Sequence, residues 1–174
     1  MKAANCIWIS LGALLALCAT VGLAADSSLA SKDKEFMEKA ARAGHAEVAA
    51  GKLASTKATH EQVKKFGERM VQDHGKAGNE LKKIAQAKGV TLPEEPDDAH
   101  KKLLTRLESS KGADFDRLYV AEAGVKDHKE AVDLFTDQVK NGKDAALKAF
   151  AQKTLPTVKE HYQMAQDLDK TVKK

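Results

Sequence analysis

The chain has 174 residues, a formal net charge of +4 at pH 7 and two cysteines, Cys6 and Cys18, both in an apolar N-terminal segment. The remainder contains no thiol, which excludes disulfide scaffolds, cysteine nucleophiles and thiolate metal sites. The small excess of basic residues is interleaved with acidic ones and only 5% of residues are aromatic, so a solvated helical surface is expected and nucleic-acid binding is not.

Residues 1–25 have the features of a secretory signal peptide. Lys2 precedes a short apolar run, and small residues follow it up to Ala25. We expect cleavage near Ala24 or Ala25, a periplasmic location and no membrane span in the mature chain. A retained anchor helix and lipidation at Cys18 are alternatives, but the apolar run is short for a span and the preceding Leu17 is bulky for lipoprotein processing.

Residues 31–171 are expected to form a single helical domain. Alanine, leucine, lysine, glutamate and glutamine dominate this region, apolar residues recur at steps of three and four, and strand patterns are nearly absent. The first helix is predicted over about residues 31–57, with Glu47 in the middle of its apolar stripe.

The second helix is predicted to begin at Thr59, because Gln62 three residues later completes a capping box. His74 lies on its apolar stripe, and Gly89 is expected to end it by supplying the left-handed residue that helix ends favour.

A long connection follows, with a short helix predicted over about residues 97–110 and ended by Gly112. The third long helix is predicted over about residues 113–140. Its apolar stripe is expected to pass through Leu118, Ala121 and His128.

Asp144 is a suitable N-cap for the last helix, which carries His161 on its stripe and Pro156 in its interior, where a kink is expected. Short turns after the first and third helices and a long link after the second predict two antiparallel hairpins joined by a crossover. Leu81 follows His74 by seven residues, as Leu168 follows His161, and this echo leaves an internal duplication open.

Each of the four long helices has one ionisable residue in the middle of its apolar stripe. These residues are Glu47, His74, His128 and His161. Burial of such groups costs several kcal/mol unless they find partners, so we expect them to meet one another or a ligand. Glu47 and His74 differ in height by about five residues, roughly 7 Å, so a centre with all four ligands needs long side-chain reach.

This residue set predicts a metal site in the bundle core, holding one zinc, iron, manganese or copper ion. The alternative is a structural hydrogen-bond network in which Glu47 pairs with a protonated histidine. Asp73 and Glu160 each precede a histidine of the set and could orient the imidazoles, although a solvated role is expected for both. His45 is expected at the surface, and Tyr119 with its hydroxyl at the rim of the core.

Several segments carry a family resemblance: EVAAGKLA from residue 47, VKKFGERMVQDH from residue 63, Phe115-Asp116, and Thr154-Leu155-Pro156. Together with His128 and His161 they resemble an exported bacterial family of unknown function, often labelled an outer-membrane protein and assigned a ferritin-like four-helix bundle. The resemblance implies the fold of nearly the whole mature chain and implies no activity.

The sequence leaves enzymatic activity open, and a redox enzyme is the least favoured class. Ferritin-type di-iron sites place a glutamate three residues before each histidine, and Val71 and Val158 occupy those positions here. No nucleophile or metalloprotease motif is present. The predicted function is therefore metal binding or stress protection in the periplasm. The alternative is a non-enzymatic envelope interaction protein. No protein partner is indicated, and a homo-oligomer is compatible with the sequence.

Overall fold

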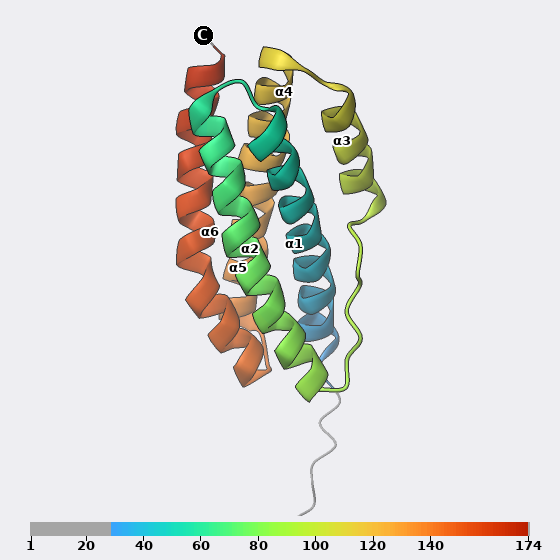
Figure 1. Ribbon diagram of the computed structural model, residues 1–174. Coiled ribbons are helices and arrows are strands. Elements are labelled where there is room, and N and C mark those ends of the chain that lie inside the picture. The colour runs from blue at the N-terminus through green and yellow to red at the C-terminus, as the bar shows by residue number, and fades with distance from the viewer. Residues whose placement is uncertain (1–28, 174) are drawn as a thin grey trace, which may run out of the picture.

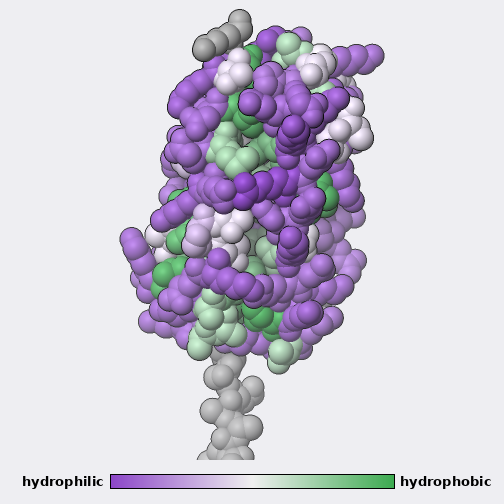
Figure 2. All heavy atoms as spheres, turned by 60° about the vertical axis from the view of Figure 1, so that its left-hand side comes forward, coloured by the Kyte–Doolittle hydropathy of each residue, from purple (hydrophilic) through white to green (hydrophobic). Residues whose placement is uncertain are grey.

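The computed structural model describes residues 29–173, and the signal peptide predicted for residues 1–25 lies outside this range. All regular elements within it are helical, which confirms the all-α prediction. None of the helices in this part of the chain combines the length and the apolar character that crossing a bilayer requires. Hydrophilic side chains cover most of the face shown in Figure 2, with small hydrophobic patches between them.

Two antiparallel hairpins joined by a crossover form the bundle, as predicted (Figure 1). The first hairpin consists of α1 (Ser31–Lys57) and α2 (Glu61–Ala87). The crossover contains α3 (Asp98–Ser109), which runs beside α1. The second hairpin consists of a continuous helical rod, made of α4 (Gly112–Tyr119), the π-helix η1 (Val120–Asp127) and α5 (His128–Asn141), followed by α6 (Ala145–Val172).

Two predicted helix ends are confirmed. Gly89 has a φ of 65° after α2, and the N–H of Val90 donates to the carbonyl of Ala85, which satisfies a free carbonyl of the last turn. The Asp144 side chain accepts from the N–H of Leu147 at 3.0 Å and caps α6. α6 continues through Pro156 and curves along its length (Figure 1).

Two other predicted ends are wrong. The residue that caps α2 is His60, whose Nδ1 accepts from the N–H of Gln62, because the hydroxyl of Thr59 donates to Asp116 instead. Gly112 does not end the crossover helix. It begins α4, with a φ of 57° that allows the chain to turn into the new helix.

Each hairpin turn is held by a buried aspartate of the other hairpin. Asp33 in α1 accepts hydrogen bonds from the backbone N–H groups of residues 143–144 in the second turn. Asp116 in α4 accepts from the backbone N–H groups of residues 59–60 in the first turn. The two carboxylates are 1% and 2% exposed, so each replaces solvent as the acceptor for these N–H groups. The two hairpins are thereby fixed to each other at both ends.

The apolar core is divided into two clusters along the bundle axis. The cluster near the turn between α1 and α2 includes Ala54, Val63, Phe66, Met70, Leu107, Phe115, Tyr119 and Leu168, and the other includes Phe36, Met37, Leu81, Phe135, Leu147 and Phe150. The four ionisable residues predicted for the core occupy intermediate positions along their helices. They form a polar layer between the two clusters.

α1 and α2 pack closely against each other at a pair of glycines. A Cβ atom added to Gly51 would lie 2.7 Å from the carbonyl oxygen of Gly67, and one added to Gly67 would lie 2.7 Å from the Cβ of Ala54. Only glycine at both positions allows this backbone separation. The first hairpin is therefore closely packed on the turn side of the polar layer.

Candidate metal centre

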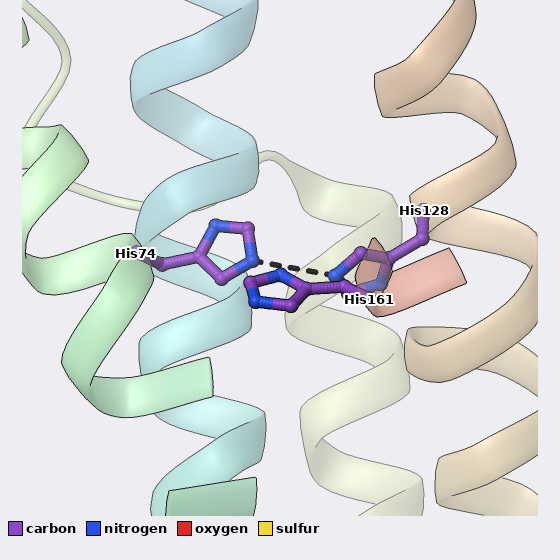
Figure 3. A group of neighbouring side chains, drawn as sticks. All are labelled: His74, His128 and His161. Carbon is purple, nitrogen blue, oxygen red and sulfur yellow. Dashed lines mark hydrogen bonds between the residues drawn. The ribbon is translucent and has the colours of Figure 1, made fainter. Parts of the chain in front are cut away.

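Three histidine side chains from three helices meet in the polar layer. His74 comes from α2, His128 from the start of α5 and His161 from α6, and their rings point toward one another (Figure 3). The ring centroids are 5.4 Å apart in all three pairs, and the Nε2 atoms of His74 and His128 are 3.3 Å apart. One ring nitrogen from each residue lies within 4.8 Å of the others. We call this group the histidine triad.

His161 is oriented by a carboxylate from the neighbouring helix α2. Its Nε2 lies 3.0 Å from Oδ2 of Asp73, and Asp73 also accepts from Nε of Arg69 at 3.2 Å. Asp73 therefore assigns the ring proton to Nε2, which leaves a lone pair on Nδ1. That Nδ1 atom is buried and has no hydrogen-bond partner among the described residues, so it is the nitrogen that His161 can offer to a ligand.

His128 is oriented by the π-helix that precedes it. Ala123 lies in η1, and its carbonyl accepts from Nδ1 of His128 at 2.9 Å. The proton is thereby assigned to Nδ1, and the Nε2 lone pair faces the triad.

The π-helix also overturns part of the sequence prediction. The predicted apolar stripe is wrong at Ala121, which is exposed, whereas Leu118 is partly buried and packs against the core, and Tyr119 and Ala123 are buried. The wider turn places more residues per turn than the 3.6 on which that stripe was based, and so shifts which side chains face the core.

Burial lowers the pKa of all three imidazoles. The pKa of His74 falls well below its usual value, that of His128 falls to about 4, and that of His161 falls in spite of the opposing effect of Asp73. Protonated rings would repel one another in this layer and would lack solvation. The triad is therefore neutral near pH 7, the protonation state in which imidazole binds metal ions.

Glu47 lies beside the triad and is not part of it. Its Oε1 atom is 3.5 Å from Nδ1 of His128, the ring nitrogen that does not face the triad. Burial, and secondarily the negative charge of Asp127, raise the pKa of Glu47 well above its usual value. Burial thus favours the uncharged forms of both Glu47 and His128 and works against an ion pair between them. Of the four predicted ligands, the structure brings three together.

Tyr119 is buried deeper than the sequence predicted. Its side chain is fully buried, and the hydroxyl has no partner among the described residues, so the prediction of a hydroxyl at the rim is wrong. Burial, and to a smaller extent the charge of Glu47, raise the pKa of this phenol well above its usual value. It stays neutral near the triad.

The triad geometry fits a first-row transition metal. Two imidazole nitrogens bound to one ion at about 2.0–2.1 Å, at a tetrahedral angle, lie about 3.3–3.4 Å apart. The separation of 3.3 Å between the Nε2 atoms of His74 and His128 matches this value, and it is also within hydrogen-bond distance, as the dashed line in Figure 3 marks. Three neutral nitrogen donors suit copper, zinc, iron or nickel, whereas magnesium and calcium prefer oxygen.

A cavity of about 570 Å³ borders all three histidines and extends between the helices. Part of its wall is apolar, with Leu81, Phe150 and Val158, and Thr154 and Thr157 add hydroxyl groups. An ion held by three protein ligands would keep a further coordination position open toward this space.

The residues that orient the triad were harder to predict than the triad itself. Asp73 was expected to be solvated, which is wrong, because it binds His161 of the opposite hairpin. Glu160, given the same expectation, is 56% exposed in its side chain and pairs with Arg69 at 2.8 Å. The role of Ala123 could not be predicted from the sequence, because this residue contacts His128 through its backbone carbonyl and not through its side chain. His45 is exposed, as predicted.

Comparison with known proteins gives a family and a fold. A family model described as "Domain of unknown function (DUF4142)" matches residues 18–168. The comparison with curated proteins gave no significant match.

Three solved structures share the fold. CopM in its Cu(II)-bound form matches with a TM-score of 0.68 and 16% identity, covering 80% of this chain and 96% of that one. CopM in its Cu(I)-bound form matches with a TM-score of 0.67 and 17% identity over the same shares of the two chains. A DUF305 protein from Streptomyces coelicolor has a TM-score of 0.66 and 12% identity, covering 79% of this chain and 91% of that one.

Proposed function

The chain belongs to the DUF4142 family of domains of unknown function, and we propose that it binds one transition-metal ion, preferentially copper, through His74, His128 and His161. The observation that carries this proposal is the convergence of three imidazole nitrogens from three helices. Two of the rings have their other nitrogen engaged by Asp73 and by the Ala123 carbonyl, the arrangement that orients metal-binding histidines in proteins.

A purely structural network explains the same residues less well. That alternative requires Glu47 to pair with a protonated histidine, whereas burial shifts the pKa of Glu47 upward and that of His128 downward and so disfavours the charged form of each side chain. It also requires each buried ring nitrogen to have a partner, whereas Nδ1 of His161 has none among the described residues. A metal ion would supply that partner.

Copper is favoured by the ligand type and by the fold. Cu(II) is the tightest binder among the divalent first-row ions at a given nitrogen site, and imidazole suits it. CopM, a protein with the same bundle fold, is known in Cu(II)-bound and Cu(I)-bound forms, which supports a copper function for this fold. With the export expected from residues 1–25, the role would be copper binding in the periplasm.

The test is metal titration of the mature protein, purified without an affinity tag, with Cu(II) and Zn(II). The variant combines His74→Ala with His128→Ala, and the control combines His45→Ala with His60→Ala, which removes two histidines outside the triad. We expect one ion per chain in the wild type and the control, and at least a hundredfold loss of affinity in the triad variant. Circular dichroism checks that it stays folded.

Equal metal content in the triad variant and the control would contradict the proposal. If the double variant unfolds, His74→Ala alone takes its place, because His74 is the least buried of the three rings. That single change removes one donor and leaves the buried pair intact.

A further inference from the structure

The cavity beside the histidine triad is acidic, although the protein as a whole is basic. Besides Glu47, whose uncharged form burial favours, six carboxylate side chains and two cationic side chains line it, in a chain whose formal net charge is +4. The two cationic side chains are Lys39 and Arg42. Lys39 is already paired with Glu35, whose carboxylate lies 2.6 Å from its Nζ atom. The local charge around the cavity is therefore opposite in sign to that of the whole chain.

Most of these carboxylates lie along one side of the cavity, which we call the acidic wall. It consists of Asp97 from the crossover and Asp127, Glu130, Asp133 and Asp137 from the second hairpin. The last four follow one another at steps of three and four residues and so share one helix face.

The acidic wall leads from solvent to the triad. The side chains of Asp133 and Asp137 are 69% and 57% exposed, whereas that of Asp127, directly before His128, is 13% exposed. Exposed ion pairs with Lys129 and Lys32 offset Asp133 and Asp137 only weakly. Glu130 has no ion-pair partner among the described residues, and Asp127 lies 3.7 Å from Nε2 of His100.

Two buried polar atoms on the cavity wall have no partner among the described residues. Oε2 of Glu47 and Nδ1 of His161 make no hydrogen bond, and these residues are 5% and 1% exposed. A neutral imidazole nitrogen accepts a metal cation as a ligand, and the Glu47 carboxyl group does so on losing its proton. These atoms are an observation independent of the acidic wall, and they indicate the same class of ligand.

We infer that the acidic wall is the entrance through which a free, hydrated divalent metal cation reaches the triad, and that it discriminates against metal ions carried in anionic chelates. The inference rests on the proposed function. A cleft lined by one sign of charge concentrates ions of the opposite sign and raises association rates by about 10–10³-fold at low salt. Screening over a Debye length of about 10 Å at 0.1 M salt removes most of this effect.

The test compares two variants of equal net charge. The wall variant carries Asp127→Asn, Glu130→Gln and Asp133→Asn. The control variant carries Glu68→Gln, Glu108→Gln and Asp167→Asn, three exposed acids that do not line the cavity. Stopped-flow measurement of tyrosine fluorescence quenching follows Cu(II) uptake by each protein over a series of ionic strengths.

We expect the wall variant to take up free Cu(II) about tenfold more slowly than the control at low salt, with the two rates converging at high salt. Dissociation rates and the stoichiometry of one ion should be the same in both. When Cu(II) is supplied as an anionic nitrilotriacetate complex, the wall variant should take up copper as fast as the control variant or faster.

Equal uptake rates and equal salt dependence in the two variants, with normal stoichiometry, would overturn this inference and leave the proposed function standing. A wild-type protein that binds no ion would overturn both. Because Asp127 precedes a ligand, a second wall variant with only Glu130→Gln and Asp133→Asn is measured beside it. This variant should show a smaller decrease of the same kind.

Discussion

The two hairpins use the same means of mutual support but contribute differently to the polar layer. Each holds the turn of the other through one buried aspartate, Asp33 or Asp116. The second hairpin supplies two fully buried histidines, both with one ring nitrogen engaged. The first hairpin supplies His74, which is partly exposed, and Glu47, whose pKa is raised by burial.

The surroundings of the histidines explain this difference. Positions 75 and 78, next to His74, are glycines whose added Cβ atoms would meet no other atom within 4 Å. In the second hairpin, an added Cβ on Gly124 would lie 3.1 Å from Ala165. The second hairpin therefore presents a fixed pair of ligands, and the first hairpin completes the triad from a more open position.

The first prediction tests whether the two turns are anchored equally. Asp33→Ala and Asp116→Ala each leave backbone N–H groups without an acceptor, and we expect each to lower the free energy of unfolding by about 3 kcal/mol. Denaturant titration measures both. Asp137→Ala, which removes a largely exposed carboxylate, should change it by less than about 0.5 kcal/mol. A large loss in only one of the two variants would show that the anchoring is not reciprocal.

The second prediction concerns opposite pH responses across the polar layer. His128 has a folded-state pKa of about 4, below its ordinary 6.5, so the unfolded state binds the proton first as the pH falls. The contribution of His128 to the free energy of unfolding is complete above pH 6.5. It decreases by roughly 3 kcal/mol as the pH falls to 4. Glu47, with a raised pKa, responds in the opposite sense and loses stability as the pH rises.

Unfolding measured from pH 4 to pH 8 in the wild type and in His128→Gln and Glu47→Gln separates the two contributions. The histidine variant should be less sensitive to acid than the wild type, and the glutamate variant more sensitive. Parallel curves for all three proteins would contradict these pKa shifts.

The third prediction tests the difference in packing within the first hairpin. Gly51→Ala places a methyl group 2.7 Å from the carbonyl oxygen of Gly67, so α1 and α2 must separate, and we expect a loss of about 2 kcal/mol. Gly75→Ala enters open space and should stabilise the protein by up to about 1 kcal/mol through helix propensity. Thermal unfolding of the two variants shows whether each change stabilises or destabilises the protein. Destabilisation by both changes would show that the region around His74 is closed.

The fourth prediction tests the link between the hairpins within the triad. Asp73→Ala removes the acceptor that orients His161 and should weaken copper binding by about 10–100-fold. Glu160→Gln removes the charge of the other carboxylate that pairs with Arg69. Because Glu160 does not contact the triad, this change should leave the affinity for copper unchanged. Competition with a chelator of known affinity measures both constants. Equal affinities would mean that Asp73 has no orienting role.

The sequence determined the helices, the hairpin topology and the choice of histidines. Helical periodicity and capping are local properties, so Gly89 and Asp144 marked their helix ends correctly. An ionisable residue in an apolar stripe must face the core of any bundle that buries that stripe. For this reason His74, His128 and His161 could be recognised without coordinates.

Tertiary structure alone decided how these residues are used. Asp73 reaches His161 because α2 packs beside α6, and Thr59 gives its hydroxyl to Asp116 because the two hairpins meet at that turn. The π-helix changes the residues per turn before His128, which a constant helical period cannot represent. The acidic wall requires the crossover to lie against the second hairpin. Each of these features depends on contacts between residues far apart in the chain or on a departure from regular geometry, and neither is encoded in local spacing.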